Sequence, residues 1–283
     1  MNPPIVLSIA GSDPSGGAGI QADLKTFSAL GVYGAAALAG LTVQNTHGVL
    51  AAHGVDPELV RAQITAVIDD LPVAATKLGM LSNAAVASTV ADLLEERRDD
   101  FGLVILDPVM VATSGDALLT DDAVATVRTR LLRLADVITP NAPEAAVLLG
   151  TAEATDTDGL IAQAVALRGI GARAALIKGG HLDGDDMTDV YATADGTALL
   201  TGPRIATPNT HGTGCTLSSA VAACSARHGD TRSDGVSLAA VEEARDYLLR
   251  AIESGSRWHL SRSDGGHGPV DHLVGRAELG GAL

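Results

Sequence analysis

The segment NTHGTGC at 209–215 gathers several residue types that can carry chemistry. It holds a histidine, a cysteine and two glycines around a threonine, and the residues after it, TLSSAVAACSARHG, have helical spacing. Glycines at a helix start leave backbone N–H groups free to point at an anion. We therefore predict that a catalytic, phosphate-binding turn is formed by Gly212, Thr213, Gly214 and Cys215.

The thiol of Cys215 could also accept a proton. A free cysteine has a pKa of about 8.5, and the N-terminus of a helix lowers it. Positioning matters more than a strong base in a loose phosphoryl-transfer transition state. We therefore interpret Cys215 as a group that orients a substrate hydroxyl and assists its deprotonation. The other cysteine, Cys224 in AVAACSA, is predicted to pack in the core.

Polar side chains suited to the same chemistry follow three other strand-like segments. Asp107 comes after GLVIL, Asn141 and Glu144 stand in TPNAPEA, and Lys178 ends ARAALIK. Carboxylate oxygens are ligands that suit Mg²⁺, and a lysine ammonium is a compact point charge for a phosphate. Together with the turn at 212–215, these residues predict phosphoryl transfer from a nucleotide.

Two common phosphate-binding loops do not fit the sequence. GSDPSGGAG has four residues between Gly11 and Gly16, but no lysine follows them, so the segment is not a P-loop. No G-x-G-x-x-G follows the first strand-like segment, which disfavours a dinucleotide site.

Apolar strand-like runs alternate with helical segments along almost the whole chain. Strands are predicted at 5–11, 34–45, 74–81, 102–110, 136–141 and 172–180. Helices are predicted at 19–31, 56–71, 82–98, 120–135, 142–150, 157–171, 213–227 and 235–254. This order is typical of a mainly parallel sheet with helices on both faces. A hairpin around Asp195-Gly196 predicts antiparallel strands at one edge.

In such sheets, ligands bind beyond the carboxyl ends of the strands, so we expect the polar motifs to meet at that edge. No linker, repeat or low-complexity tract divides the chain. We predict a single domain over residues 1–283, with a less regular tail from residue 258.

The composition limits the partners. The chain has 34 Asp and Glu against 19 Lys and Arg, a formal net charge of −15. Nucleic acids and anionic membranes attract basic surfaces, so neither is an expected partner. The sequence shows neither a signal peptide nor an apolar run of about 18 residues that would span a membrane. Two cysteines nine residues apart on one helix are too distant for a disulfide, so we expect free thiols and a cytoplasmic protein.

Longer motifs carry a resemblance to a known family. GSDPSGGAGIQADLKTFSALGVYG at 11–34 is similar to the start of hydroxymethylpyrimidine kinase / phosphomethylpyrimidine kinase, in the ribokinase-like superfamily. The match continues in order through VQNTHG, TKLGML, LDPVM, TPNAPEA, IKGGH, NTHGTGCTLSSA and GHGPV, and covers residues 5–270. The resemblance implies a three-layer α/β fold of the ribokinase-like type. Its central sheet would be mostly parallel, with helices on both faces and a small antiparallel edge hairpin.

The resemblance also implies a reaction. It is the ATP-dependent phosphorylation of 4-amino-5-hydroxymethyl-2-methylpyrimidine to its monophosphate and then to the diphosphate, in thiamine biosynthesis. Mg²⁺ would be the cofactor and ATP the co-substrate, and relatives imply a homodimer. Where this chain has Cys215, much of the superfamily has an aspartate that serves as the base, so the share of the sulfur in catalysis stays open.

Site residues are implied by the same motifs. The pyrimidine pocket would be lined by Gly11, Ala18, Asp23, Gln44, Met80 and Val109. In it, the carboxamide of Gln44 can pair with a ring nitrogen and an exocyclic amine. Asp23 would take the hydroxymethyl or amino group, and Met80 would be an apolar wall. The nucleotide would contact Asn141, Glu144, Lys178 and Thr210, with Mg²⁺ near Asp107 and Glu144.

Several residues of these motifs receive no chemical role. Lys25 and Lys77 lie in matching motifs, and His267 falls in the family's tail motif, but none is given a function. Metal binding by His47 or His211 would need closely placed partners, so both are interpreted as turn or pocket-wall residues.

Other functions stay open at this point. The nearest alternative is a pyridoxal/pyridoxine kinase or a dual-specificity kinase of the same superfamily. Gln44 disfavours this alternative, because relatives that act on pyridoxal tend to lack the glutamine. A thiol hydrolase would need glycines on both sides of the nucleophile, where Thr213 and Leu217 stand. A non-catalytic pyrimidine sensor would not need carboxylates and a lysine together. The acidic segment 181–189 is a candidate lid near the nucleotide.

Overall fold

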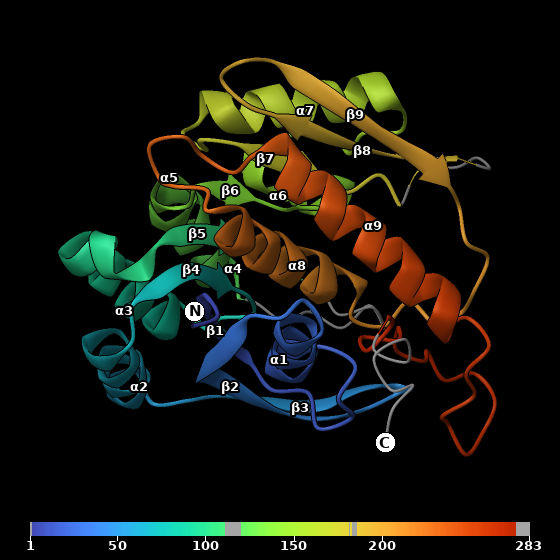
Figure 1. Cartoon of the computed structure of the whole chain (residues 1–283), viewed down its shortest axis with the longest axis horizontal. Helices are drawn as coiled ribbons and strands as arrows, with labels where there is room; N and C mark the ends of the chain where they lie inside the picture. Colours follow the sequence, from blue (N-terminus) through green and yellow to red (C-terminus); the bar gives the residue numbers. More distant parts are fainter. Residues whose placement is uncertain (1, 111–119, 181, 183–185, 276–283) are drawn as a thin grey trace.

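The computed structural model describes residues 2–110, 120–180, 182 and 186–275. In this part of the chain a nine-stranded sheet has the order β3-β2-β1-β4-β5-β6-β7-β8-β9 (Figure 1). The strands β2, β1, β4, β5, β6 and β7 run parallel to one another. The predicted fold class, a mostly parallel sheet with an antiparallel edge, is confirmed.

The strands are shorter at the centre than the sequence predicts. Their bounds are β1 Ile5–Gly11, β2 Tyr33–Asn45, β3 Gly48–Gly54, β4 Val73–Leu78, β5 Leu103–Leu106, β6 Val137–Ile138, β7 Ala175–Ile177, β8 Asp186–Ala192 and β9 Thr197–Pro203. The hairpin expected around Asp195-Gly196 is β8–β9. The two-residue β6 replaces a longer prediction, because the chain leaves the sheet at Thr139 to start the next helix.

One strand was not predicted. β3 pairs antiparallel with β2, and the chain reverses at Thr46-His47, between the paired Asn45 and Gly48. The side chain of Asn45 accepts a hydrogen bond from the N–H of His47 at 2.8 Å, which stabilises this turn. The sheet therefore carries antiparallel strands at both edges, since β8 and β9 lie at the other one.

Helices cover both faces of the sheet. Their bounds are α1 Gly19–Ala29, α2 Pro57–Asp70, α3 Ala84–Arg97, α4 Asp121–Thr126, α5 Leu132–Leu134, α6 Ala142–Leu149, α7 Thr157–Gly169, α8 Thr213–His228 and α9 Leu238–Gly255, and a π-helical turn joins α4 to α5. Buried side chains of α2, α3, α6 and α7 form one core, and those of α1, α8 and α9 form the other (Figure 1). This is the three-layer arrangement that the alternating pattern predicts.

Local sequence explains where the helices begin. The side chain of Asp56 accepts the N–H groups of Glu58 and Leu59 at the start of α2, and Pro57 occupies the first turn. Before α8, Gly212 has a φ of +80°. A Cβ there would also lie 1.8 Å from the carbonyl oxygen of Gly17, so both the backbone conformation and the close approach require glycine.

The parallel strands end at one edge of the sheet, which brings the loops after β1, β4, β5, β6 and β7 together. The N-terminus of α8 lies at the same edge, as α8 packs against β1, β4 and β5. No helix in the described residues is long and apolar enough to cross a membrane. Of the candidate lid at 181–189, residues 181 and 183–185 lie outside the described residues, which resume at the start of β8.

Candidate active site

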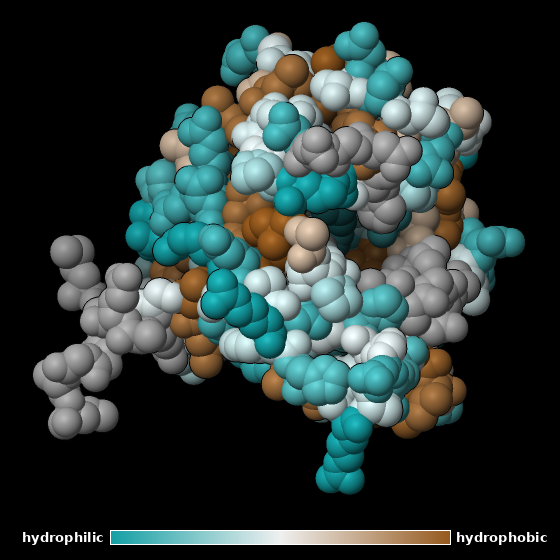
Figure 2. Space-filling view, turned by 90° about the vertical axis from the view of Figure 1, so that its right-hand side faces the viewer, coloured by the Kyte–Doolittle hydropathy of each residue, from teal (hydrophilic) through white to brown (hydrophobic). Residues whose placement is uncertain are grey.

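A cavity of about 620 Å³ opens at this edge of the sheet. The face of the molecule seen in Figure 2 is hollowed near its centre, between hydrophilic and hydrophobic side chains. Of the predicted site residues, the cavity is lined by Gly11, Ala18, Gln44, Met80, Asp107, Val109, Asn141, Glu144, Lys178, Thr210, Gly212, Thr213, Gly214 and Cys215. Asp23 alone among them is not part of this lining.

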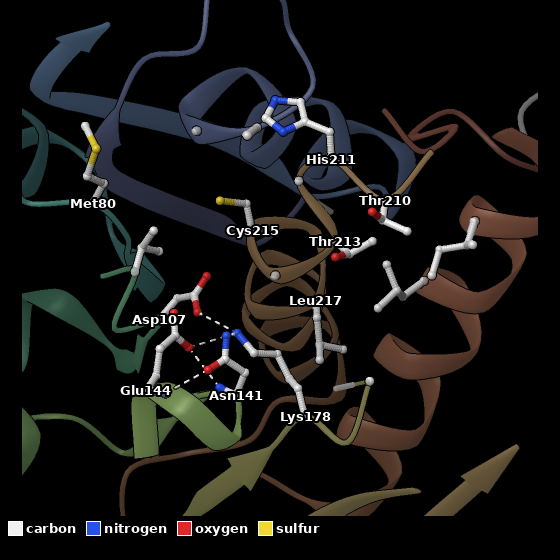
Figure 3. A pocket seen from close by; sticks show the side chains of 18 of the residues that line it. Met80, Asp107, Asn141, Glu144, Lys178, Thr210, His211, Thr213, Cys215 and Leu217 are labelled. Carbon is white, nitrogen blue, oxygen red and sulfur yellow. Dashed lines mark hydrogen bonds and ion pairs between the residues drawn. The ribbon is translucent and has the colours of Figure 1, made fainter. Parts of the chain in front are cut away.

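The turn at the start of α8 lies between the two ends of the cavity (Figure 3). The first N–H groups of a helix have no partner inside the helix, and the helix dipole is positive there. A Cβ on Gly214 would lie 3.3 Å from Nζ of Lys178 and 3.6 Å from Oδ2 of Asp107. The missing side chain therefore keeps the backbone of the turn open toward the charged groups opposite it.

The thiol of Cys215 does not have the lowered pKa expected from its place at a helix start. Removal from water raises the pKa of Cys215 to about 11. The charge of Lys77 opposes this rise, while Asp23 and Asp107 add to it. Desolvation outweighs the helix N-terminus here, so the sulfur is a neutral thiol at pH 7. Both Cys215 and Cys224 are free thiols, and Cys224 is buried in the core as predicted.

Opposite the turn, Lys178 stands between two carboxylates (Figure 3). Its Nζ lies 3.1 Å from Oδ1 of Asp107 and 3.6 Å from Oε2 of Glu144. Burial acts to lower the pKa of Lys178, but the two carboxylates outweigh it and raise the pKa, so the ammonium stays charged. Burial also raises the pKa of Glu144, against the charge of Lys178.

The helix cap before α6 positions Glu144. The N–H of Asn141 donates to Oε2 of Glu144 at 2.8 Å, and the N–H of Glu144 donates to Oδ1 of Asn141 at 2.8 Å. This capping box fixes both side chains at the rim of the cavity. Asp107 is held in a similar way, by the hydroxyls of Thr139 at 3.3 Å and Ser218 at 3.2 Å.

Two acidic oxygens thus converge on one cationic position, a donor set that fits a divalent ion. Within the described residues there is no group of three or more His, Cys, Asp and Glu side chains that could hold a metal. Asp107 and Glu144 could therefore provide only part of a coordination shell.

The other end of the cavity is built from the loops after β1 and β4. A Cβ on Gly11 would lie 2.2 Å from Cε of Met80, so glycine at 11 leaves room for the methionine. Gln44 points into the cavity from the end of β2, 3.2 Å from the hydroxyl of Thr42. These residues combine an apolar wall with one carboxamide, a surface that suits a small aromatic ring with polar edges.

Asp23 is not at the position expected for substrate contact. Its side chain is fully buried on α1. Nζ of Lys77 donates a hydrogen bond to each of its two carboxylate oxygens, both at 2.9 Å. The hydroxyls of Ser8 at 2.6 Å and Ser219 at 2.7 Å also donate to it. Four hydrogen bonds from three neighbouring side chains satisfy this carboxylate beneath the cavity, so it has no free oxygen to offer to a substrate.

Sequence reasoning gave no chemical role to two lysines and two histidines that the structure now places. Lys77 is the buried partner of Asp23. Lys25 donates to the carbonyl oxygen of Gly16 at 2.7 Å and so supports the loop after β1. Exposed His47 contacts the hydroxyls of Ser261 and Ser263 at 3.0 and 3.1 Å. The N–H of His267 donates to the carbonyl oxygen of Thr46 at 2.8 Å, so the tail of the chain closes over the β2–β3 turn.

Asp13 and Asp189 line the cavity but were not predicted. Asp13 follows β1 within GSDPSGG, and its place after a buried strand was the available signal. Asp189 accepts the N–H of Gly179 at 2.8 Å and Nε of Arg245 at 2.9 Å, which ties the loop after Lys178 to α9. The signal for Asp189 was weak, since this residue stands inside a strand, β8, rather than at the end of one.

The remaining wall near α9 is apolar. It is formed by Leu217 of α8 and by Leu248 and Ile252 of α9, together with Ile205. This wall adjoins the end of the cavity that holds Lys178 and Thr210. Apolar side chains at this place can cover a flat heterocycle such as a nucleotide base.

Comparison with known proteins agrees with this geometry. The model of the phosphomethylpyrimidine kinase family matches residues 13–271. The chain is 50% identical over 271 residues to hydroxymethylpyrimidine/phosphomethylpyrimidine kinase of Rhizobium meliloti, covering 95% of this chain and 97% of that protein. It is 42% identical to the thiamine biosynthesis bifunctional protein ThiED of Geobacter sulfurreducens, covering 97% of this chain and 53% of that protein.

The solved structures give the same fold with a different printed activity. An ADP complex of pyridoxal kinase from Bacillus subtilis superposes with a TM-score of 0.84 at 33% identity, covering 98% of this chain and 100% of that one. The family resemblance of the motifs is thereby confirmed, and a thiol hydrolase and a non-catalytic sensor are set aside. The chain belongs to the phosphomethylpyrimidine kinase family and is a phosphotransferase.

Proposed function

We propose that the protein phosphorylates 4-amino-5-hydroxymethyl-2-methylpyrimidine with ATP, and then phosphorylates the monophosphate to the diphosphate for thiamine synthesis. One observation carries the proposal: the N-terminal turn of α8 lies between a small apolar end with one carboxamide and a charged end with one lysine and two carboxylates. A phosphoryl group held at this turn would have an acceptor on one side and a nucleotide on the other.

The end of the cavity near β1 and β4 would bind the pyrimidine. Gly11, Ala18, Met80 and Val109 would enclose the ring, and Gln44 would pair with its polar edge. Asp23 is left out of this set, because Lys77 and the neighbouring hydroxyls occupy its oxygens. We assign to it a structural role beneath the cavity.

The opposite end would bind the nucleotide. Asn141, Glu144, Lys178 and Thr210 would face its phosphates, and the apolar wall of α8 and α9 would cover its base. Asp107 and Glu144 would hold Mg²⁺, which supplies charge stabilisation for the phosphate oxygens when bound. Lys178 lies within reach of the turn, so its ammonium would stabilise the transferring phosphoryl group.

The turn itself would hold the transferring group through backbone N–H groups from Gly212 to Cys215. Cys215 would orient the hydroxyl of the substrate. As a neutral thiol with a pKa of about 11, it is a poor base at pH 7. We therefore place most of the catalytic effect on charge stabilisation and positioning, which dominate in phosphoryl transfer.

A second function, the phosphorylation of pyridoxal-type alcohols, is favoured by the likeness to the pyridoxal kinase of Bacillus subtilis. The same cavity could accept a pyridine ring of similar size. The amino group of the pyrimidine is the distinguishing feature, since Gln44 can pair with it and with the adjacent ring nitrogen.

A coupled ATPase assay with purified protein would test both functions. We expect turnover with hydroxymethylpyrimidine and with its monophosphate, and a kcat/KM for pyridoxal at least about tenfold lower, the effect of one lost polar pairing. Equal values of kcat/KM for hydroxymethylpyrimidine and pyridoxal would mean that the protein is a dual-specificity kinase. Lack of turnover with either pyrimidine would overturn the proposal.

We further propose a single kinase domain over residues 1–283 that works as a cytoplasmic homodimer. The single nine-stranded sheet, to which strands from Ile5 to Pro203 contribute, supports one domain. The two free thiols are typical of a reducing compartment. Sedimentation equilibrium at several protein concentrations would test the dimer, with a mass near 28.5 kDa contradicting it.

A further inference from the structure

Asp13 and His211 form a buried pair at the pyrimidine end of the cavity. Oδ2 of Asp13 lies 2.8 Å from Nε2 of His211, and the two side chains are 1% and 7% exposed as residues. Figure 3 shows His211 above the first turn of α8. A Cβ on Gly17 would lie 2.4 Å from Cδ2 of His211, so glycine at 17 makes room for the ring.

The hydrogen bonds around Asp13 fix the proton on His211. Besides the ring, the carboxylate of Asp13 accepts the N–H groups of Ser15, Gly17 and Ala18 and the hydroxyl of Ser15. Burial would raise the pKa of Asp13, but the bonds from His211 and Ser15 outweigh it and lower the pKa to about 2. An ionised carboxylate can only accept, so Nε2 of His211 carries a hydrogen whether the ring is neutral or charged.

That hydrogen limits how Gln44 can meet the ring. The terminal nitrogen of Gln44 stands 3.4 Å from Nε2 of His211. Both atoms would then be donors, and two donors do not form a hydrogen bond. With the carboxamide turned by 180°, its oxygen would instead accept from His211, which can share its hydrogen between this oxygen and Asp13.

Thr42 leads to the same orientation from the other side of the amide. Its hydroxyl lies 2.9 Å from the carbonyl oxygen of Ser12 and 3.2 Å from Oε1 of Gln44. A hydroxyl has one hydrogen, and the shorter contact, to the carbonyl of Ser12, is the better place for it. The hydroxyl oxygen of Thr42 is then left as an acceptor, which favours the amide nitrogen of Gln44 over its oxygen.

We infer that the Asp13–His211 pair and Thr42 are positioning residues that hold the carboxamide of Gln44 with its oxygen toward His211 and its nitrogen toward Thr42. Two independent contacts favour this one orientation, and the oxygen and nitrogen of an amide are told apart by their hydrogen bonds. The inference rests on the proposed function in one respect, that Gln44 pairs with the substrate.

The consequence is a fixed polarity for the ligand. Gln44 keeps one N–H and one oxygen lone pair for the cavity, and neither can exchange places with the other while His211 and Thr42 hold the amide. A 4-aminopyrimidine offers an amine donor beside a ring-nitrogen acceptor, which matches. A 4-oxopyrimidine offers an acceptor beside a ring N–H, which is the reverse pattern. A freely rotating glutamine would accept both.

The direct test measures the binding of two ligands by isothermal titration calorimetry without nucleotide. The ligands are 4-amino-5-hydroxymethyl-2-methylpyrimidine and its 4-oxo analogue. We expect wild-type protein to prefer the amino ligand about 100-fold, the effect of two mismatched hydrogen bonds. In Thr42→Val/His211→Phe the preference should fall below about tenfold, because the amide can turn. An unchanged preference in the folded double variant would overturn the inference.

Matched variants separate positioning from general disruption. Thr42→Ser keeps the hydroxyl and His211→Gln keeps a donor for Asp13 and Gln44, so each should keep the preference for the amino ligand. In steady-state assays the double variant should raise KM for the amino substrate while kcat changes by less than about threefold, as for lost ground-state binding. Equal losses of kcat in all variants, with the ligand preference intact, would mean a structural role and would contradict the inference.

A measurement on the unaltered protein covers the case in which the double variant does not fold. In ¹⁵N-labelled protein, the side-chain NH₂ of Gln44 should show a nuclear Overhauser contact to the methyl group of Thr42. A contact to the ring of His211 instead would overturn the orientation. If wild-type protein bound neither ligand, the proposed function would fail, while this contact would still decide the orientation of Gln44.

Discussion

Two lysines near the ends of parallel strands, β4 and β7, have different surroundings. Lys77 near the end of β4 and Lys178 after β7 both carry carboxylate partners within about 4 Å, the range of an ion pair. The side chains of Lys77 and Asp23 are 0% exposed, and no residue of that pair lines the cavity. Lys178 is 17% exposed and faces the cavity.

The difference lies in what surrounds the carboxylate. Asp23 also binds two serine hydroxyls, so its charge is fully used within the fold. Asp107 also accepts two hydroxyls, but at 3.3 and 3.2 Å, and it shares a single ammonium with Glu144 at distances of 3.1 and 3.6 Å. Both carboxylates line the cavity. A satisfied buried pair is a structural feature, whereas an incompletely satisfied one at a cavity can exchange partners with a ligand. Site and scaffold are distinguished here by hydrogen-bond saturation, not by residue type.

The largest effect that would test this contrast is on stability. Lys77→Met leaves the carboxylate of Asp23 buried without its counter-charge, which should lower the free energy of unfolding by about 3–5 kcal/mol. Urea denaturation followed by circular dichroism would measure the loss. The Lys77→Met/Asp23→Leu protein removes both charges and should recover most of it. A single variant as stable as wild type would mean that Asp23 is not buried in solution.

Lys178→Met should lose activity rather than stability, in contrast to Lys77→Met. The neighbouring carboxylates face the cavity and can take up a proton or a cation, so the protein should remain folded. Phosphoryl transfer should fall by about 10²–10³-fold, the usual effect of removing one charge-stabilising group. Lys178→Arg keeps the charge and serves as the matched control in the same coupled assay. The contrast between the lysines would fail if Lys178→Met and Lys77→Met lost stability and turnover alike.

The fold was predicted from the sequence because its signals are local and repeated. Apolar runs of strand length alternate with helical segments, and Asp56 and the glycines mark their ends. The strand β3 was not predicted, because GVLAAHG is short, is rich in alanine and glycine, and depends on pairing with β2. Its register follows from a tertiary contact that no local pattern contains.

The sequence predicted the site residues only from motifs that stand at strand ends, and it did not show which of these residues face the cavity. Asp23 and Lys77 lie in matching motifs as Gln44 and Lys178 do, yet they face inward. The prediction of a lowered pKa for Cys215 was wrong for the same reason. The helix start was visible in the sequence, while the desolvation that raises the pKa was not. Burial is a property of the assembled layers, so it separates these residues only in the structure.

The thiol of Cys215 gives a smaller, pH-dependent test. With a pKa of about 11, Cys215 is ionised only to about 0.1% at pH 8, against about 10% for an ordinary thiol of pKa 9.0. Iodoacetamide should therefore modify Cys215 about 100-fold more slowly than such a thiol at that pH. Because a raised pKa keeps the neutral form, the rate should rise about tenfold per pH unit up to about pH 11.

Mass spectrometry of Cys224→Ala protein would follow Cys215 alone in this experiment. The charge of Lys77 lowers the pKa of Cys215, so Lys77→Met should slow the modification further, provided that the variant is folded. A rate that levels off near pH 8 would instead indicate an ionised thiol and would restore the base role for Cys215.

The smallest effect on stability is expected for an ion pair that is exposed to water. Arg61 and Glu96 form an ion pair of 3.0 Å between α2 and α3, with side chains 30% and 56% exposed. Solvent screens such a pair, so Arg61→Met should change the free energy of unfolding by less than about 1 kcal/mol and leave turnover unaltered. Urea denaturation in low and high salt would check this. A loss as large as that of Lys77→Met would show that ion-pair distance, rather than burial, decides the contribution, and the contrast between the two lysines would lose its physical basis.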